Sequence, residues 1–167
     1  NHAYDHRAET GVATKDAWGT SFRQFKDVGA QREYHFTVPE VLRLIDAAEP
    51  DFALVLKAAF YMGARPGELR KLSVKDFKPA SKQLNIAKGK TKARSTTLTN
   101  EAVQFFAFLT RDKMPNAPLL TKADGTAWEA GDQKIPMRAA LVAAGLFTAT
   151  QLDDMARHER PVLYSLR

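Results

Sequence analysis

The chain has 167 residues, of which 44% are hydrophobic and 26% are charged, and its formal net charge at pH 7 is +6. This composition is typical of one folded domain, or of one domain with a short extension, and it excludes a disordered chain. The sequence contains no cysteine and no run of 18 apolar residues, which excludes disulfides, thiolate metal sites and a membrane span and fits a reducing compartment such as the cytoplasm.

The first 36 residues show no persistent apolar period, and Gly11, Gly19 and Gly29 interrupt them. They also lack the charged-then-apolar pattern of a signal peptide. A self-contained domain of this length without metal or disulfides would be unusual. Residues 1–36 are therefore predicted to be an extended lead-in whose aromatic side chains dock onto the rest of the protein.

The first helix after this lead-in is predicted to begin at Thr37. Thr37 can cap the helix, and Glu40 completes a capping box three residues later. Apolar residues then recur at helical spacing. This predicted inward-facing stripe consists of Val41, Leu42, Leu44 and Ile45.

Two further helices are predicted before the pattern changes. One covers residues 50–62, begins with a proline and ends at Gly63. The other is short, covers residues 66–72 and begins at Pro66. Both positions suit proline, because the first turn of a helix does not need its N–H groups.

The second half of the chain combines a small sheet with more helices. Residues rich in β-formers, with turn signals between them, predict two or three antiparallel strands near residues 73–77, 83–88 and 95–99. Helices are predicted near residues 100–111, 132–144 and 150–159, with a proline-rich loop at 114–118. The predicted fold class is mainly α-helical with a small antiparallel β-sheet.

Positive charge is concentrated in one part of the chain. Residues 1–36 hold five basic and five acidic residues, whereas residues 65–94 hold ten basic residues against Glu68 and Asp76, a local charge of +8. Such a patch suggests a polyanionic partner, of which nucleic acid is the first candidate. A solvated basic face is the alternative that composition leaves open.

Two other kinds of site are not supported by the sequence. Gly89-Lys90-Thr91 resembles the end of a P-loop, but that motif needs a glycine where Leu84 stands. A P-loop also connects a strand to a helix, whereas this stretch is predicted to be a turn between two strands. The four histidines are scattered along the chain, so no zinc site is predicted. Neither a metal nor a cofactor is expected.

The stretch KGKTKAR, residues 88–94, alternates cations with small or polar residues. If the strand pleat continues through it, Lys88, Lys90, Lys92 and Arg94 all point to one face. Four like charges on one face repel one another unless an anion is bound there. An exposed basic hairpin tip is the other interpretation.

The stretch YMGARPGELRKL, residues 61–72, places Arg65 at the joint between two predicted helices. The planar guanidinium makes two hydrogen bonds to a phosphate at once. The N–H groups and positive dipole end of the helix that begins at Pro66 favour an anion at the same place, and Glu68 can hold the guanidinium from behind. The simpler interpretation is a surface ion pair between Arg65 and Glu68 at i, i+3.

Taken together, these stretches resemble the catalytic domain of the tyrosine recombinases, the phage integrase family, over residues 37–167. GARPGELRKL resembles the first arginine box of the family, T-G-x-R-x-x-E-L, and KGKTKARSTTL resembles its lysine-bearing β-hairpin. The final YSLR resembles the start of the second box, H-x-L-R-H, and GTAWEAGDQKIPMRAALVAAGL resembles the segment before that box. Arg65 and Arg167 lie 102 positions apart with the hairpin between them, in the order that the family requires.

The resemblance implies phosphoryl transfer on DNA without metal, through a 3′-phosphotyrosine intermediate. Arg65 and Arg167 would clamp the phosphate, Lys90 would protonate the leaving 5′ oxygen, and Tyr164 would hydrogen-bond the phosphate. Lys88 and Lys92 remain alternatives for the catalytic lysine. The supporting roles that the resemblance implies are orientation of a neighbouring group by Glu68 and contacts to DNA by Lys88, Lys92 and Arg94.

The sequence departs from the family pattern in two ways. Tyr164 stands where the second box has its first histidine, and a phenol donates a hydrogen bond but is no near-neutral base. The remaining box and the nucleophilic tyrosine are expected beyond Arg167, so the chain alone is expected to be inactive. Residues 1–36 resemble the linker from an arm-and-core DNA-binding region.

The function that the resemblance implies is site-specific DNA recombination or integration. Its expected partners are double-stranded DNA and other recombinase protomers, and no membrane is expected to be involved. The protein is expected to be bacterial or phage-encoded and to act in the cytoplasm. The alternative is a non-catalytic DNA-binding protein derived from an integrase.

Overall fold

The computed structural model describes residues 34–86, 93–156 and 158–166. The chain divides into the units Asn1–Gln31 and Arg32–Arg167, and every described residue belongs to the second unit. The predicted lead-in lies outside the described residues except for its last three positions, and the division of the chain at residue 36 stays a prediction. The described part is mainly helical with a three-stranded antiparallel sheet, which confirms the predicted fold class.

Helix α4 (Val38–Ala47) begins where the capping box predicted it. The Glu40 carboxylate accepts the backbone N–H of Thr37 at 2.7 Å, which satisfies a donor that the helix leaves unpaired. The predicted stripe is buried at Val41, Leu44 and Ile45, but the prediction for Leu42 is wrong, because its side chain is 51% exposed. Leu42 lies about 100° around the helix from Val41, off the face that the other three residues share.

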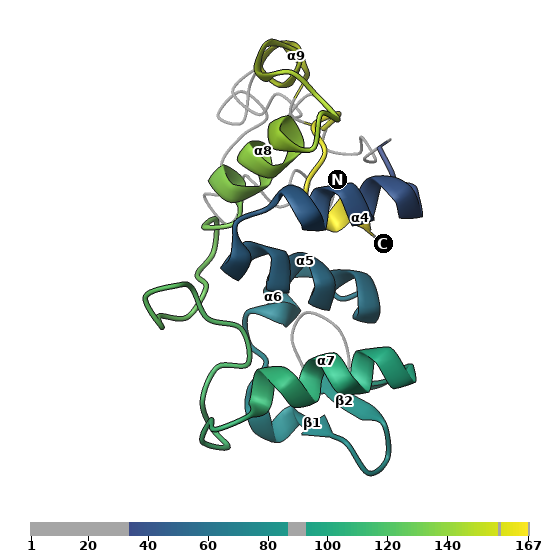
Figure 1. The fold of residues 1–167 in the computed structure, drawn as a ribbon, viewed down its shortest axis with the longest axis vertical. Helices are drawn as coiled ribbons and strands as arrows, with labels where there is room; N and C mark the ends of the chain where they lie inside the picture. Colours follow the sequence, from purple (N-terminus) through teal and green to yellow (C-terminus); the bar gives the residue numbers. More distant parts are fainter. Residues whose placement is uncertain (1–33, 87–92, 157, 167) are drawn as a thin grey trace, which may run out of the picture. The chain divides into compact units, whose positions relative to one another are not determined.

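Helix α5 (Pro50–Met62) has the predicted bounds and occupies the centre of this unit. It contacts α4, the short helix α6 (Pro66–Leu69) and the final turn η2 (Leu163–Leu166), and Figure 1 shows α4 between α5 and α8 (Lys134–Ala143). A helix with neighbours on several sides is apolar around much of its circumference. Its buried residues accordingly are Phe52, Val55, Leu56, Ala58, Ala59 and Met62.

Gly63 ends α5 in the left-handed conformation, with φ of 55°. A Cβ at this position would have no heavy atom within 4 Å, so the backbone conformation alone disfavours a side chain. We expect Gly63→Ala to lower the free energy of unfolding by about 1 kcal/mol in urea denaturation. Gly67→Ala is the matched control: it also has open space but no left-handed φ, and we expect it to be neutral or slightly stabilising. Equal effects of the two changes would contradict this explanation.

The segment after Gly63 differs from its prediction. Helix α6 (Pro66–Leu69) is a single turn, and the chain then pairs with a distant loop, where the N–H of Leu119 donates to the carbonyl of Leu72 at 2.8 Å. The predicted strand near residues 73–77 is instead a 3-10 turn, η1 (Val74–Asp76), followed by the short strand β1 (Phe77–Lys78). The Asp76 carboxylate accepts both the N–H and the hydroxyl of Ser73, which favours a turn over a strand.

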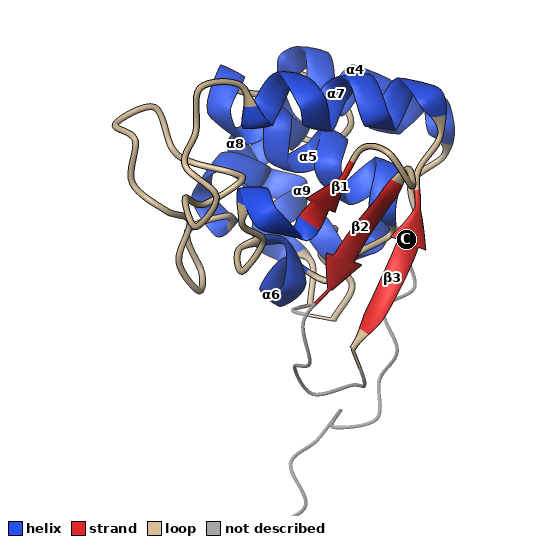
Figure 2. Cartoon of the chain, turned by 90° about the horizontal axis from the view of Figure 1, so that it is seen from below, coloured by secondary structure: helices blue, strands red, loops and turns tan. Residues whose placement is uncertain are grey.

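The sheet has the strand order β1-β2-β3, as Figure 2 shows, with β2 at Gln83–Ile86 and β3 at Arg94–Thr97. Its register pairs Phe77 with Leu84 and Ile86 with Arg94. Helix α7 (Asn100–Thr110) packs against it, with the Phe77 and Phe106 ring centroids 5.9 Å apart. The predicted hairpin is therefore present up to residue 86 and from residue 93, and its tip, 87–92, lies outside the described residues.

The remaining elements return the chain to α4 and α5. Helix α8 (Lys134–Ala143) contacts α4, helix α9 (Ala149–Asp154) contacts α8, and the 3-10 turn η2 (Leu163–Leu166) contacts α5. Both helices are shorter than predicted. The N–H of Phe36 donates to the carbonyl of Ser165 at 3.3 Å, so the start of the described chain is bonded to η2.

Candidate functional site

Arg65 is placed by the joint between α5 and α6. Gly63 ends α5, Ala64 is buried, and Arg65 has extended backbone angles (φ −73°, ψ 149°) immediately before Pro66. Extended geometry is what a residue before proline prefers. The Arg65 side chain is 42% exposed, so its guanidinium reaches the surface from a backbone anchored in the core.

The Glu68 carboxylate lies at the centre of a group of donors. Its Oε2 accepts the backbone N–H of Arg65 at 2.9 Å and Nη2 of Arg94 at 3.0 Å, and its Oε1 lies 3.9 Å from Nη1 of Arg65. The Glu68 side chain is only 13% exposed. The predicted i, i+3 pair between Arg65 and Glu68 is thus present but long, and the shorter contact comes from Arg94 on strand β3.

The electrostatics of Glu68 follow from these contacts. Burial raises the pKa of its carboxyl, but the hydrogen bond from the Arg65 N–H and the hydrogen bond and charge of Arg94 outweigh burial, so the pKa lies below its usual value. A carboxyl with a lowered pKa stabilises the fold above its unfolded-state pKa, and this contribution is lost as the pH falls through the folded-state pKa. Glu68 therefore remains ionised at neutral pH.

The expected dipole effect at this joint is smaller than the sequence suggested. Helix α6 has four residues, and the backbone N–H of Arg65, the residue before it, already donates to Glu68. A single turn aligns few peptide dipoles, so it contributes little of the charge that a full helix end carries. The anion site predicted at this joint stays a prediction, and it would depend on the Arg65 guanidinium more than on the helix dipole.

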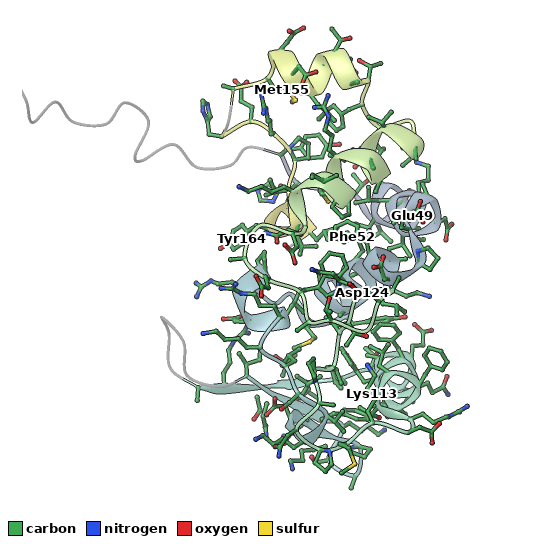
Figure 3. The ribbon with its side chains drawn as sticks, turned by 90° about the vertical axis from the view of Figure 1, so that its left-hand side faces the viewer. Glu49, Phe52, Lys113, Asp124, Met155 and Tyr164 are labelled. Atoms are coloured by element: carbon green, nitrogen blue, oxygen red, sulfur yellow. The ribbon has the colours of Figure 1, made fainter. Side chains whose placement is uncertain are left out.

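Tyr164 lies on the turn η2. Its side chain is 40% exposed, whereas Leu163, Ser165 and Leu166 around it are buried and hold the turn in place. Figure 3 shows Tyr164 at the level of Phe52 of α5, which agrees with the contact between α5 and η2. Pro66 and Tyr164, far apart in the sequence, line one groove of about 650 Å³.

The groove has a cationic wall that sequence reasoning missed. Lys134 and Arg138 of α8 and Arg160 line it, and none of the described residues that line it is acidic. Arg138 is bound to Asp153 at 2.9 Å, and Arg160 donates to the carbonyls of Asp153 and Met155 at 3.0 Å, so both attach α9 to this wall. The i, i+4 spacing of Lys134 and Arg138 in a predicted helix was the available signal, because it places both on one face.

Of the predicted site residues, the structure describes Arg65, Glu68, Arg94 and Tyr164. It brings the first three together at Glu68, and it places Tyr164 in the groove that Pro66 also lines. The other predicted site residues, Lys88, Lys90, Lys92 and Arg167, lie outside the described residues.

Two further findings concern only the part of the chain that the structure describes. There, no group of three or more histidine, cysteine, aspartate or glutamate residues is arranged to hold a metal ion. Within the same residues, no helix combines the length and the apolar character needed to cross a membrane.

No family of known proteins and no curated protein matches the sequence. Solved structures do match the fold. XerA recombinase superposes with a TM-score of 0.59 at 19% identity, over 80% of this chain and 47% of that chain. A lambda integrase (75–356) dimer bound to a COC′ core site superposes with a TM-score of 0.65 at 19% identity, over 98% of this chain and 56% of that chain.

A second lambda integrase structure, residues 75–356 bound to DNA, has a TM-score of 0.65 at 17% identity and covers 97% of this chain and 56% of its own. The chain thus spans about half the length of the structures it matches. At these identities the similarity shows the fold alone. The order of elements, the small antiparallel sheet and these superpositions together establish that the chain has a tyrosine recombinase-like fold.

Proposed function

We propose that the chain is part of a site-specific DNA recombinase of the tyrosine type. The observation that carries this proposal is the meeting of three distant segments. Arg94 at the base of the basic hairpin bonds to Glu68 of α6, beside Arg65, and Tyr164 of η2 lines one groove with Pro66, the first residue of α6. The two lambda integrase structures of the same fold are bound to DNA, which supports duplex DNA as the partner.

The proposed reaction is phosphoryl transfer without metal. A tyrosine attacks the scissile phosphate, the bond to the 5′ oxygen breaks, and the resulting 3′-phosphotyrosine keeps the bond energy for rejoining. Negative charge increases on the non-bridging oxygens in the transition state, and Arg65 with Arg167 would stabilise it. Lys90 would give its proton to the leaving 5′ oxygen, and Tyr164 would donate a hydrogen bond to the phosphate.

Each remaining part of the site has a role in this proposal. Glu68 would orient Arg65 through the backbone N–H that it accepts, while Lys88 and Lys92 would contact the DNA backbone. The cationic wall formed by Lys134, Arg138 and Arg160 would add to the positive potential beside the phosphate. Other recombinase protomers would complete the assembly on DNA, in the cytoplasm.

The salt dependence of binding to a duplex tests this proposal. Each phosphate contact releases counterions, so log K falls with log salt at a slope of about −0.9 per contact. We expect K88A/K90A/K92A to flatten the slope by about 2 to 3 in fluorescence anisotropy, because up to three contacts are removed.

The matched control removes three exposed cations from α4, α5 and the end of α7, as R43A/K57A/R111A. It changes the net charge equally and should leave most of the slope in place. An unchanged slope in the hairpin variant would show that the hairpin does not contact DNA, and an equal change in the control would show that the slope follows net charge and gives the hairpin no special role.

A further inference from the structure

Glu68 is shared unequally between its two arginines. Arg94, 26 residues further along the chain, lies 3.0 Å from Oε2. Arg65 is only three residues away, but its Nη1 lies 3.9 Å from Oε1, and its backbone N–H donates to Oε2. The shorter ion pair is therefore the one that depends on the tertiary structure.

This arrangement has a consequence for the charge of Arg65. One carboxylate between two guanidinium groups leaves a net charge of +1 on the three side chains. If Arg94 were absent, Arg65 and Glu68 would form an ordinary i, i+3 pair, and arginine with a carboxylate favours a bidentate geometry. Such a pair would occupy the same N–H groups with which an arginine binds a phosphate.

The position of Arg94 suits a residue that prevents this closure. It is the first residue of β3, paired with Ile86, so the sheet fixes its backbone. Its side chain is 41% exposed and crosses to the mostly buried Glu68. The contact thus links the base of the hairpin to the α5–α6 joint.

We propose that Arg94 is a positioning residue that prevents Glu68 from closing onto the Arg65 guanidinium, so that Arg65 can bind a phosphate. This inference rests on the function proposed above and specifies how its first arginine is kept active. It assigns Arg94 a role through Glu68 in place of the direct contact with DNA that the sequence suggested.

The test is a double-mutant cycle in duplex DNA binding, with R94A, E68Q and R94A/E68Q compared by fluorescence anisotropy. We expect R94A to weaken binding about tenfold, the value of one charged hydrogen bond. We expect R94A/E68Q to recover to about the affinity of E68Q, because glutamine keeps an oxygen for the Arg65 N–H but has no charge to hold the guanidinium. R111A, an exposed arginine at the end of α7, controls for the loss of one positive charge.

The proposal is supported if R94A costs about tenfold when Glu68 is present and nothing in the E68Q background, because a direct contact of Arg94 with DNA would cost the same in both backgrounds. If R94A weakens binding as much in the E68Q background as in the unaltered protein, Arg94 itself contacts DNA and the proposal is overturned. Binding by R94A equal to that of the unaltered protein would also overturn it.

A measurement without DNA keeps the two proposals separate. We expect the Arg65 Nε–Hε resonance in NMR to move towards that of a carboxylate-bound arginine in R94A, and E68Q to reverse this shift. If R65A binds DNA as well as the unaltered protein does, the proposed function of Arg65 fails. The NMR result then still decides whether Arg94 controls the pairing of Arg65, and an unmoved resonance in R94A would refute that.

Discussion

Replacement of Phe52 by alanine is expected to lower the free energy of unfolding by about 3–5 kcal/mol, the usual cost of removing a buried phenylalanine from a core. Phe52 is fully buried near the start of α5, and its ring lies 5.7 Å from that of Trp128. Helix α5 contacts both α6 and η2, the two turns that carry Arg65 and Tyr164. A cavity here would therefore loosen the support of the candidate site as well as the core.

Urea denaturation measures this effect, and Phe108→Ala is the matched control. Phe108 lies on α7 with 61% of its surface exposed, so its replacement is expected to cost less than about 0.5 kcal/mol. If both variants lose the same stability, or if Phe52→Ala loses less than about 1 kcal/mol, the position of α5 at the centre of the core is wrong.

Tyr34 is expected to stay protonated in the folded protein at pH 11, where an ordinary tyrosine is about 90% ionised. Burial, with the hydrogen bond to Glu40 and the negative charge of Glu40, raises the pKa of Tyr34 to about 12. The phenol O–H donates to Oε1 of Glu40 at 2.9 Å. Because the folded-state pKa is the higher one, the stabilisation is complete below about pH 10 and is lost as the pH rises towards 12.

The Cζ resonance of Tyr34 in NMR, followed from pH 8 upwards while the protein remains folded, measures this titration. Glu40→Gln is expected to lower the pKa of Tyr34 only in part, because burial remains. Y61F should leave the Tyr34 titration unchanged, and titration of Tyr34 near pH 10 in the folded protein would contradict the contact with Glu40.

This titration bears on the proposed chemistry. A nucleophilic tyrosine must lose its proton, and a pKa near 12 leaves about a hundredfold less phenolate than an ordinary tyrosine has at neutral pH. Tyr61 is half-buried between aromatic rings, with ring centroids 6.0 Å from Phe60 and 5.5 Å from Phe105. Neither residue is therefore suited to in-line attack on a phosphate in the fold described above.

The local elements were largely determined by the sequence alone. Proline at the first turn, a capping carboxylate three residues after Thr37, and glycine at the helix end act within a few residues, and they set the bounds of α5 and the start of α4. Apolar spacing identified most of the buried face of α4, although Leu42 shows that an apolar residue beside the stripe can remain exposed. Arg65 and Glu68 were recognisable as a pair because their separation is one turn of helix.

The tertiary structure decided what that pair does. Residues 72–75 bond to the loop at 115–119, and this pairing replaced most of a predicted strand, since a distant segment supplied partners that no local pattern specifies. The contact between Arg94 and Glu68 spans 26 residues of sequence. Pro66 and Tyr164 line the same groove although most of the described sequence lies between them. Local hydrogen bonds and helical spacing act over three or four residues and can be read from the sequence, whereas the sharing of one carboxylate by two arginines depends on how the sheet and α5 pack together.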